Sequence, residues 1–241
     1  MTHTHLTIEP MNRHSPSERM TNLLLARLGL NLADLEVGPA ERGHLLWQPE
    51  KEMDSVVFPL SGMVSLVVDT ADGRSAEVAT VGREGAVGVT PGLQPLAAFA
   101  RAVVQIPGEM ARVEFAQLRE LAQARPLIAG TLDRWREVLL RQVMQGAACN
   151  ALHETLERAA RWIAMTRDRS DTDELPLTQE FLAEMLGVNR PTVTLAAQDL
   201  AARGLIEYHR GLVRVLDREG LDKAACDCLR AGRAAYRQLL A

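Results

Sequence analysis

Short apolar runs alternate with tight-turn residues between positions 37 and 113, and this alternation constrains the fold more than any other feature of the chain. The runs occupy residues 56–60, 63–68, 76–81, 102–106 and 110–113. Turn dipeptides such as Ser61-Gly62 and Asp72-Gly73 separate them at close spacing. Runs of this length with such punctuation are typical of short strands. The segment is therefore predicted to form an antiparallel β-roll or jelly roll.

Helical periodicity dominates the next segment, where apolar residues recur at helical spacing from position 127 to position 162. An apolar stripe of this length needs a partner to bury it. We expect a homodimer helix, because small residues such as Gly146 would let a second helix approach closely. The predicted dimer contacts are Leu132, Trp135, Leu139, Val143 and Gly146. A core helix within one chain is the alternative.

Residues 179–198 fit a helix-turn-helix position by position. Ala183 is small where the second helix must pass close to the first, and Gly187 supplies the backbone freedom of the tight turn. Asn189 can cap the second helix. Pro191 then falls in the first turn of that helix, where its missing N–H does no harm.

The second helix of such a motif projects its N-terminal residues toward the major groove of DNA. The residues predicted to contact DNA there are Asn189, Arg190, Thr192, Thr194 and Gln198. An arginine can bond a guanine edge through two hydrogen bonds, and a threonine can reach base edges, a thymine methyl group or phosphate. Residues 204–215 are predicted to form two short strands, a wing, with His209 and Arg210 at the tip suited to phosphate or the minor groove.

The overall charge excludes a protein that coats nucleic acid by bulk attraction. Lys and Arg number 27 against 31 acidic residues, which gives a net charge of −4, and 25 of the basic residues are Arg. A site-specific reader that places a few arginines on one surface stays compatible with this balance.

Three cysteines are too few for a secreted disulfide framework, and we expect a reducing cytoplasm. Cys226 and Cys228 lie two residues apart on a predicted helix, so their thiols are expected to point to different sides and to hold no metal. Cys149 is expected to be a small packing residue. The chain shows no apolar export signal and no run of about 18 apolar residues, so we expect no contact with a membrane.

The predicted fold class is α+β, in five parts. We expect a flexible tail over residues 1–20, with no role for its His3 and His5 pair, and a β-roll over 21–125. A dimerisation helix region over 126–166, a winged helix-turn-helix over 167–220 and a C-terminal helix over 221–241 follow. The polar stretch 167–176 is either a hinge or an ordinary solvated loop.

In the order of these parts the sequence resembles the Crp-Fnr family of bacterial transcription regulators over nearly the whole chain. FPLSGMVSLVV and the residues up to position 88 look like the effector barrel of the family, and residues 127–162 are similar to its dimerisation helix. The stretch LTQEFLAEMLGVNRPTVTLAAQDLAARGLIEYHRGLVRV is similar to its winged helix, and this part of the match is the more specific.

The chain departs from the phosphate cassette of members that bind cyclic AMP, a Gly-Glu facing an Arg-Ser. Gly88 falls at the glycine of the cassette, but Val89 stands at the glutamate, and the apolar residues 95–100 replace the Arg-Ser region. Arg101 is the one nearby candidate for an effector contact. We therefore expect a cyclic-nucleotide-binding-like domain whose effector is unknown and is not cyclic AMP.

Two other features of the family are altered or missing. In the recognition helix Pro191 stands at the usual Glu and Leu195 at the second Arg, so a different operator is expected. The cysteines do not match the four N-terminal ligands of the family's iron–sulfur sensors, and His14 and His44 are isolated, so no cofactor is predicted.

The resemblance implies a non-enzymatic transcription regulator that binds double-stranded DNA as a homodimer on a palindromic operator, with RNA polymerase as a candidate further partner. Two alternatives belong to other classes. A cupin-type barrel enzyme needs several His residues close to Glu on its strands, yet His44 is the single histidine of residues 37–113. A winged helix that mediates protein–protein interaction would differ from a DNA reader in the salt dependence of binding.

Overall fold

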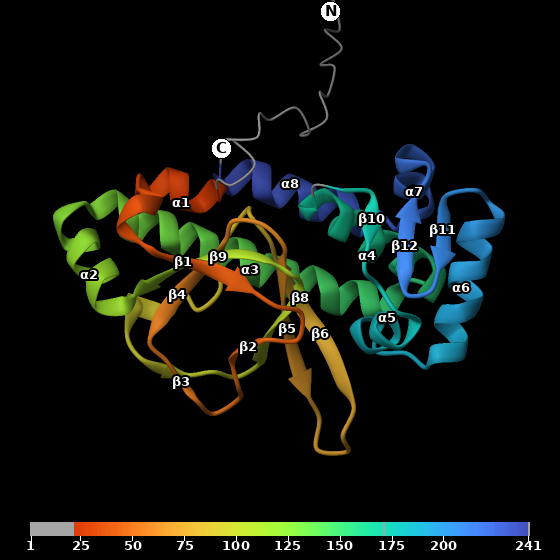
Figure 1. Cartoon of the computed structure of the whole chain (residues 1–241), viewed down its shortest axis with the longest axis horizontal. Coiled ribbons are helices and arrows are strands. Elements are labelled where there is room, and N and C mark those ends of the chain that lie inside the picture. Colours follow the sequence, from red (N-terminus) through yellow and green to blue (C-terminus); the bar gives the residue numbers. More distant parts are fainter. Residues whose placement is uncertain (1–21, 171, 241) are drawn as a thin grey trace, which may run out of the picture.

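The computed structural model describes residues 22–170 and 172–240, with side chains up to residue 237. The predicted tail, with His3, His5 and His14, lies outside the described residues. An antiparallel β-roll forms one end of the molecule and a winged helix-turn-helix the other, with a long helix running between them (Figure 1). The predicted α+β class and the predicted order of its parts are confirmed.

The β-roll is built from antiparallel pairs of strands. One sheet has the order β1-β9-β4 and a second the order β2-β8-β5-β6, and a short β3-β7 pair lies apart. The bounds are β1 Glu36–Ala40, β2 Leu45–Trp47, β3 Glu52–Met53, β4 Ser55–Pro59, β5 Met63–Asp69, β6 Ser75–Val81, β7 Leu96–Ala97, β8 Arg101–Ile106 and β9 Gly108–Glu114. Strand β4 is buried throughout, which is why its sequence is apolar without alternation.

Helices α1 (Leu23–Leu28), α2 (Phe115–Ala124) and α3 (Pro126–Leu152) and two short 3-10 turns, Leu32–Asp34 and Pro91–Leu93, complete the β-roll domain. Trp135 of α3 is fully buried and donates its Nε1–H to the Ala86 carbonyl oxygen at 2.7 Å. Gly85 lets the ring approach, because a Cβ at this position would lie 1.9 Å from it. This contact fastens the long helix to the roll.

The predicted single helix from 127 to 162 is wrong, because α3 ends at Leu152 and α4 (Thr155–Arg169) begins after a break of two extended residues, His153 and Glu154. The two helices bury their stripes in different cores. Trp135 belongs to the core of the β-roll, whereas Trp162 of α4 belongs to the core of the winged helix. One straight helix could not keep both faces inward. The polar stretch 167–176, predicted as a hinge or loop, contains the short strand β10 (Glu174–Leu175).

The C-terminal domain surrounds a second core with α4, α5 (Gln179–Leu186), α6 (Arg190–Ala202), β11 (Ile206–His209), β12 (Leu212–Val215) and α7 (Arg218–Ala224). Strands β10, β12 and β11 pair in that order. The expected single C-terminal helix is two, since α8 (Cys228–Leu240) follows α7 and lies along α3 (Figure 1). Among the described helices, none is long and apolar enough to cross a membrane.

The predicted dimer stripe lies on the wrong face of α3. Leu132 and Trp135 are 3% and 0% exposed and pack into the chain's own core. Leu139 and Val143 are half-buried, with Leu139 against the same core, and Gly146 faces the Val78 carbonyl of β6. Helical periodicity predicts an apolar stripe but not what covers it. Here the β-roll of the same chain covers the stripe. The opposite face of α3 leaves other apolar residues exposed, namely Leu140, Met144, Ala147 and Ala151.

Candidate nucleic-acid interface

The turn between α5 and α6 has the geometry that its sequence predicts. Gly187 ends α5 in the left-handed region at φ +62°, where its N–H bonds the Ala183 carbonyl. Asn189 Oδ1 then accepts the backbone N–H of Thr192 at 3.0 Å and the Thr192 hydroxyl at 2.6 Å. The capped start of α6 thus holds Arg190 at the first helical position, fully outside the domain core.

Helix α6 has one buried and one exposed face. Val193, Ala196, Ala197 and Leu200 are buried against α4 and α5. Arg190, Pro191, Leu195 and Gln198 are exposed on the other side. Because α6 lies at the end of the molecule farthest from α2, this exposed face is open to a ligand as large as DNA (Figure 1).

The two predicted threonine contacts are more enclosed than expected. Thr192 and Thr194 are half-buried. The Thr194 hydroxyl lies 2.9 Å from Gln179 Oε1 of α5 and 3.0 Å from the Arg190 carbonyl oxygen. These hydroxyls therefore hold the start of α6 in place, and their contact with DNA stays a prediction.

Leu195 is the candidate that the sequence analysis missed as a contact. Its side chain is 67% exposed in the middle of the outer face of α6. An exposed leucine there can pack against a thymine methyl group. The spacing Pro191, Leu195, Gln198 was the available signal, since residues four and three apart share a helix face.

The wing is a tight hairpin between β11 and β12 with Arg210 and Gly211 at its turn. Both residues have positive φ, 45° and 80°, as a type I′ turn requires. Asn or Gly would fit the first of these positions better than Arg. Arg210 therefore places its charge at the exposed tip at a conformational cost, beside the exposed His209.

Ion pairing separates the arginines of this surface into two groups. Arg203 pairs with Asp199, and Arg214 lies 3.9 Å from Glu174 and 4.0 Å from Glu207. Arg190 and Arg210 have no acidic partner among the residues that the structure describes. The positive end of the α6 dipole adds to the charge at Arg190. The unneutralised positive charge thus gathers at the two predicted contact points.

The winged helix is docked on the outer face of the β-roll. Arg101 of β8 bridges Asp69 of the roll, at 3.0 Å, and Glu184 of α5, at 2.5 Å. Glu84 pairs with Arg169 of α4 at 2.6 Å with both side chains buried. Arg101, predicted as a candidate effector contact, is thus engaged in holding the two domains together.

Glu77 of β6 makes a third contact between the domains. Its carboxylate accepts the Trp162 Nε1–H at 2.7 Å and the Ser65 hydroxyl at 2.6 Å. Burial raises the pKa of Glu77 to about 7, and the opposing effects of these hydrogen bonds and of nearby Arg169 and Arg161 are smaller.

We expect the raised pKa of Glu77 to make the folded state less stable as pH rises from about 4.5 to about 7. The folded state holds this proton more tightly than the unfolded chain, so its stabilising effect is complete below the unfolded pKa and is lost through the folded one. Glu77→Gln should flatten the profile in this window relative to wild type and to the exposed control Glu52→Gln. Urea unfolding at pH 5, 6 and 8 measures it. Parallel profiles for wild type and Glu77→Gln would contradict the assignment.

The region that aligns with the phosphate cassette of cyclic-AMP-binding members presents apolar side chains. At Gly88, φ is +85° and a Cβ would lie 2.8 Å from the Trp47 ring. Val89 packs against the core of the roll, and Phe99 is 83% exposed. Neither side chain offers a donor to a cyclic phosphate.

Comparison with known proteins assigns both domains. The cyclic nucleotide-binding domain model matches residues 39–125, and the Crp-like helix-turn-helix domain model matches residues 157–224. The chain belongs to the Crp-Fnr family. This Crp-Fnr chain is 26% identical over 191 residues to the CRP-like cAMP-activated global transcriptional regulator of Mycobacterium tuberculosis, covering 76% of this chain and 85% of that one.

Solved structures of the Crp-Fnr family share the fold. FixK2 from Bradyrhizobium japonicum superposes with a TM-score of 0.69 at 17% identity, over 80% of this chain and 98% of that one. A CRP-family regulator from Thermus thermophilus superposes with a TM-score of 0.65 at 21% identity, over 78% and 96%. The matched family consists of transcription regulators with a helix-turn-helix DNA-binding domain, which is not an enzyme class.

Proposed function

We propose that this Crp-Fnr regulator binds a palindromic operator as a homodimer and responds to an effector other than cyclic AMP. The observation that carries the proposal is the outer face of α6 and the wing tip, where Arg190 and Arg210 remain without acidic partners among the described residues. Only such uncompensated arginines gain fully from contact with a polyanion.

In this proposal the DNA contacts divide by role. Arg190 reads a guanine edge, Leu195 and Gln198 read bases one to two turns further along α6, and His209 and Arg210 contact the backbone. Asn189, Thr192 and Thr194 hold the start of α6 and are placed to reach phosphate or base edges as it enters the groove. The protein reads the site through the N-terminal part of α6, from Arg190 to Gln198.

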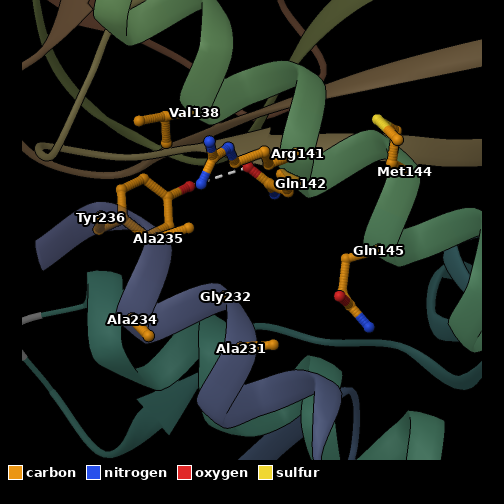
Figure 2. A pocket seen from close by; sticks show the side chains of 10 residues that line it. All are labelled: Val138, Arg141, Gln142, Met144, Gln145, Ala231, Gly232, Ala234, Ala235 and Tyr236. Carbon is orange, nitrogen blue, oxygen red and sulfur yellow. Dashed lines mark hydrogen bonds between the residues drawn. The ribbon is translucent and has the colours of Figure 1, made fainter. Parts of the chain in front are cut away.

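The proposed dimer interface is the exposed face of α3. Leu140, Met144, Ala147 and Ala151 follow one another at spacings of four, three and four, the pattern of a coiled-coil seam. A groove of about 430 Å³ beside this seam, between α3 and α8, is lined by Met144, Gln142 and Tyr236 (Figure 2). A second copy of α3 fits the seam, and pairing brings the two α6 helices to one molecule of DNA. They must lie roughly 34 Å apart to enter successive major grooves.

The effector proposal depends on the β-roll. The M. tuberculosis relative is named as cAMP-activated. Here valine replaces the cassette glutamate, and the residues at positions 95–100 lack the guanidinium and hydroxyl that a cyclic phosphate requires. Either a different effector or the ligand-free β-roll itself would set the relative orientation of the two winged helices.

The experiment that tests DNA reading compares three arginine variants on operator and scrambled duplexes. Arg190→Ala is expected to cost about 1 to 3 kcal/mol on the operator and to relax the preference at one base position. Arg210→Ala should weaken binding to both duplexes and reduce the slope of log affinity against log salt by about one. Arg203→Ala is the control, because Asp199 already neutralises Arg203 at the far end of the same helix. Fluorescence anisotropy at several salt concentrations measures all three.

The operator itself comes from footprinting the purified protein across its own genome. If Arg190→Ala leaves operator affinity intact, α6 is not the reader. If wild-type binding to DNA is also insensitive to salt, the alternative of a winged helix that binds protein gains support.

A further inference from the structure

All three cysteines of the chain meet at the break between α3 and α4. Cys149 belongs to the last turn of α3, and His153 follows its end. Cys226 precedes α8, and Cys228 is its first residue. The expectation that Cys226 and Cys228 point apart is wrong, because only Cys228 is helical, Cys226 precedes the turn at Asp227, and the two thiol sulfurs lie within 4.8 Å of each other.

The four side chains enclose a space of the size of one metal ion. Their ligand atoms all lie within 4.8 Å of one another. Cys149 Sγ is 3.4 Å from Cys226 Sγ, and Cys228 Sγ is 3.6 Å from His153 Nδ1. A tetrahedral zinc ion with Zn–S of about 2.3 Å and Zn–N of about 2.0 Å separates two sulfurs by about 3.8 Å and a sulfur from a nitrogen by about 3.5 Å. An iron–sulfur cluster, with several irons between its thiolates, requires a wider site.

Neighbouring side chains orient the ligands as in known metal sites. His153 Nε2 lies 3.5 Å from Asp227 Oδ1, which favours the proton on Nε2 and leaves Nδ1 free toward the thiols. Gln145 Nε2 donates to Cys228 Sγ at 3.0 Å. Both contacts support the ligands from outside the tetrahedron.

The charge around the cluster is suited to thiolates. Arg158 and Arg161 of α4 lie close enough to interact electrostatically with Cys149. The Nε atoms of both arginines are buried and have no hydrogen-bond partner among the described residues. Three thiolates and a neutral imidazole around a divalent ion carry a net charge of −1, which the nearby guanidinium groups of Arg158 and Arg161 stabilise.

We propose that Cys149, His153, Cys226 and Cys228 bind one zinc ion, which ties the start of α8 to the break between α3 and α4. The ligands come from the last turn of α3, from the break itself and from a segment more than 70 residues further along the chain. Bound metal therefore holds α8 against α3 at the point where the β-roll domain meets the winged helix. The site stands independently of the proposed DNA readout.

The test uses the full-length chain, reduced, freed of metal with a chelator, and titrated with Co²⁺ as the spectroscopic probe and with Zn²⁺. We expect one ion per chain, intense visible bands of tetrahedral cobalt and near-ultraviolet charge transfer from thiolate to cobalt. Cys149→Ser, Cys226→Ser, Cys228→Ser and His153→Gln should each remove or reduce these signals. His44→Gln, an exposed histidine outside the cluster, is the matched control and should bind as wild type does.

Asp227→Asn provides a second test of metal binding if a ligand variant fails to fold. Asp227 is exposed, so its change should leave the circular dichroism spectrum intact while it weakens metal binding about 10- to 100-fold. The proposal is overturned if folded wild-type protein shows no charge-transfer band, if His153→Gln binds like wild type, or if mass spectrometry finds a Cys149–Cys226 disulfide that forms in preference to metal binding.

Discussion

Replacing Leu140 with Asp is expected to convert a dimer into a monomer and to lower affinity for a palindromic operator at least about 1000-fold, the usual margin between specific and non-specific binding. Leu140 is 53% exposed and is the first residue of the 4-3-4 seam on α3. A carboxylate there would be buried against its symmetry mate, and two like charges in an apolar seam are strongly unfavourable. A monomer presents one α6 and loses the second half-site. Analytical ultracentrifugation and anisotropy measure the two effects.

The control for the seam is Leu127→Asp. Leu127 is 67% exposed on the same helix but outside the 4-3-4 spacing, so its change should leave the dimer intact. Leu139→Asp would be uninformative, because Leu139 packs against the chain's own core and a carboxylate there is expected to destabilise the β-roll itself. A wild-type protein that sediments as a monomer at micromolar concentration, or a Leu140→Asp variant that stays dimeric, would place the interface elsewhere.

Glu84→Gln is expected to lower the free energy of unfolding by about 3 to 5 kcal/mol, the cost of breaking a buried ion pair from one side. Glu84 and Arg169 have side chains only 12% and 7% exposed. The remaining hydrogen-bond partners of Arg169 are neutral, namely the Tyr236 hydroxyl and the Met165 carbonyl oxygen. The variant therefore leaves a buried guanidinium without its counter-charge between β-roll, α4 and α8. Urea denaturation at fixed salt measures the change.

The double variant Glu84→Gln with Arg169→Gln should recover part of that loss, since no unpaired charge is then buried. Asp72→Asn is the surface control. The Arg74–Asp72 pair is 84% and 54% exposed, and its loss should cost less than about 1 kcal/mol. Equal effects of Glu84→Gln and Asp72→Asn would show that the Glu84–Arg169 pair is not effectively buried in solution.

The helix-turn-helix could be predicted from sequence because its elements are local. Asn189 caps α6, Gly187 turns the chain and Arg190 begins the helix, all within four residues. Local hydrogen bonds and backbone preferences decide such features, and they are the same in any surroundings. The strands of the β-roll could be predicted for the same reason, because turn residues between short apolar runs indicate hairpins in any protein.

The partners of each apolar face needed the tertiary structure. The period of α3 predicted a stripe of Leu132, Trp135 and Leu139, but periodicity carries no information about what covers it. The β-roll covers that face, and the exposed seam lies opposite. The break at His153 could not be predicted from the sequence either. It arises because the apolar residues before it pack into the core of the β-roll and those after it pack into the core of the winged helix.

Sequence alone was enough to predict the family, the order of the parts and the residues that begin α6. Each of these follows from contacts between residues near one another in the chain. Only the tertiary structure decided that Arg101 joins the domains and that Cys149 and His153 meet Cys226 and Cys228. Those groups are more than 70 residues apart, and their meeting depends on how two cores pack and on the return of α8 along α3. No local preference encodes a contact of that kind.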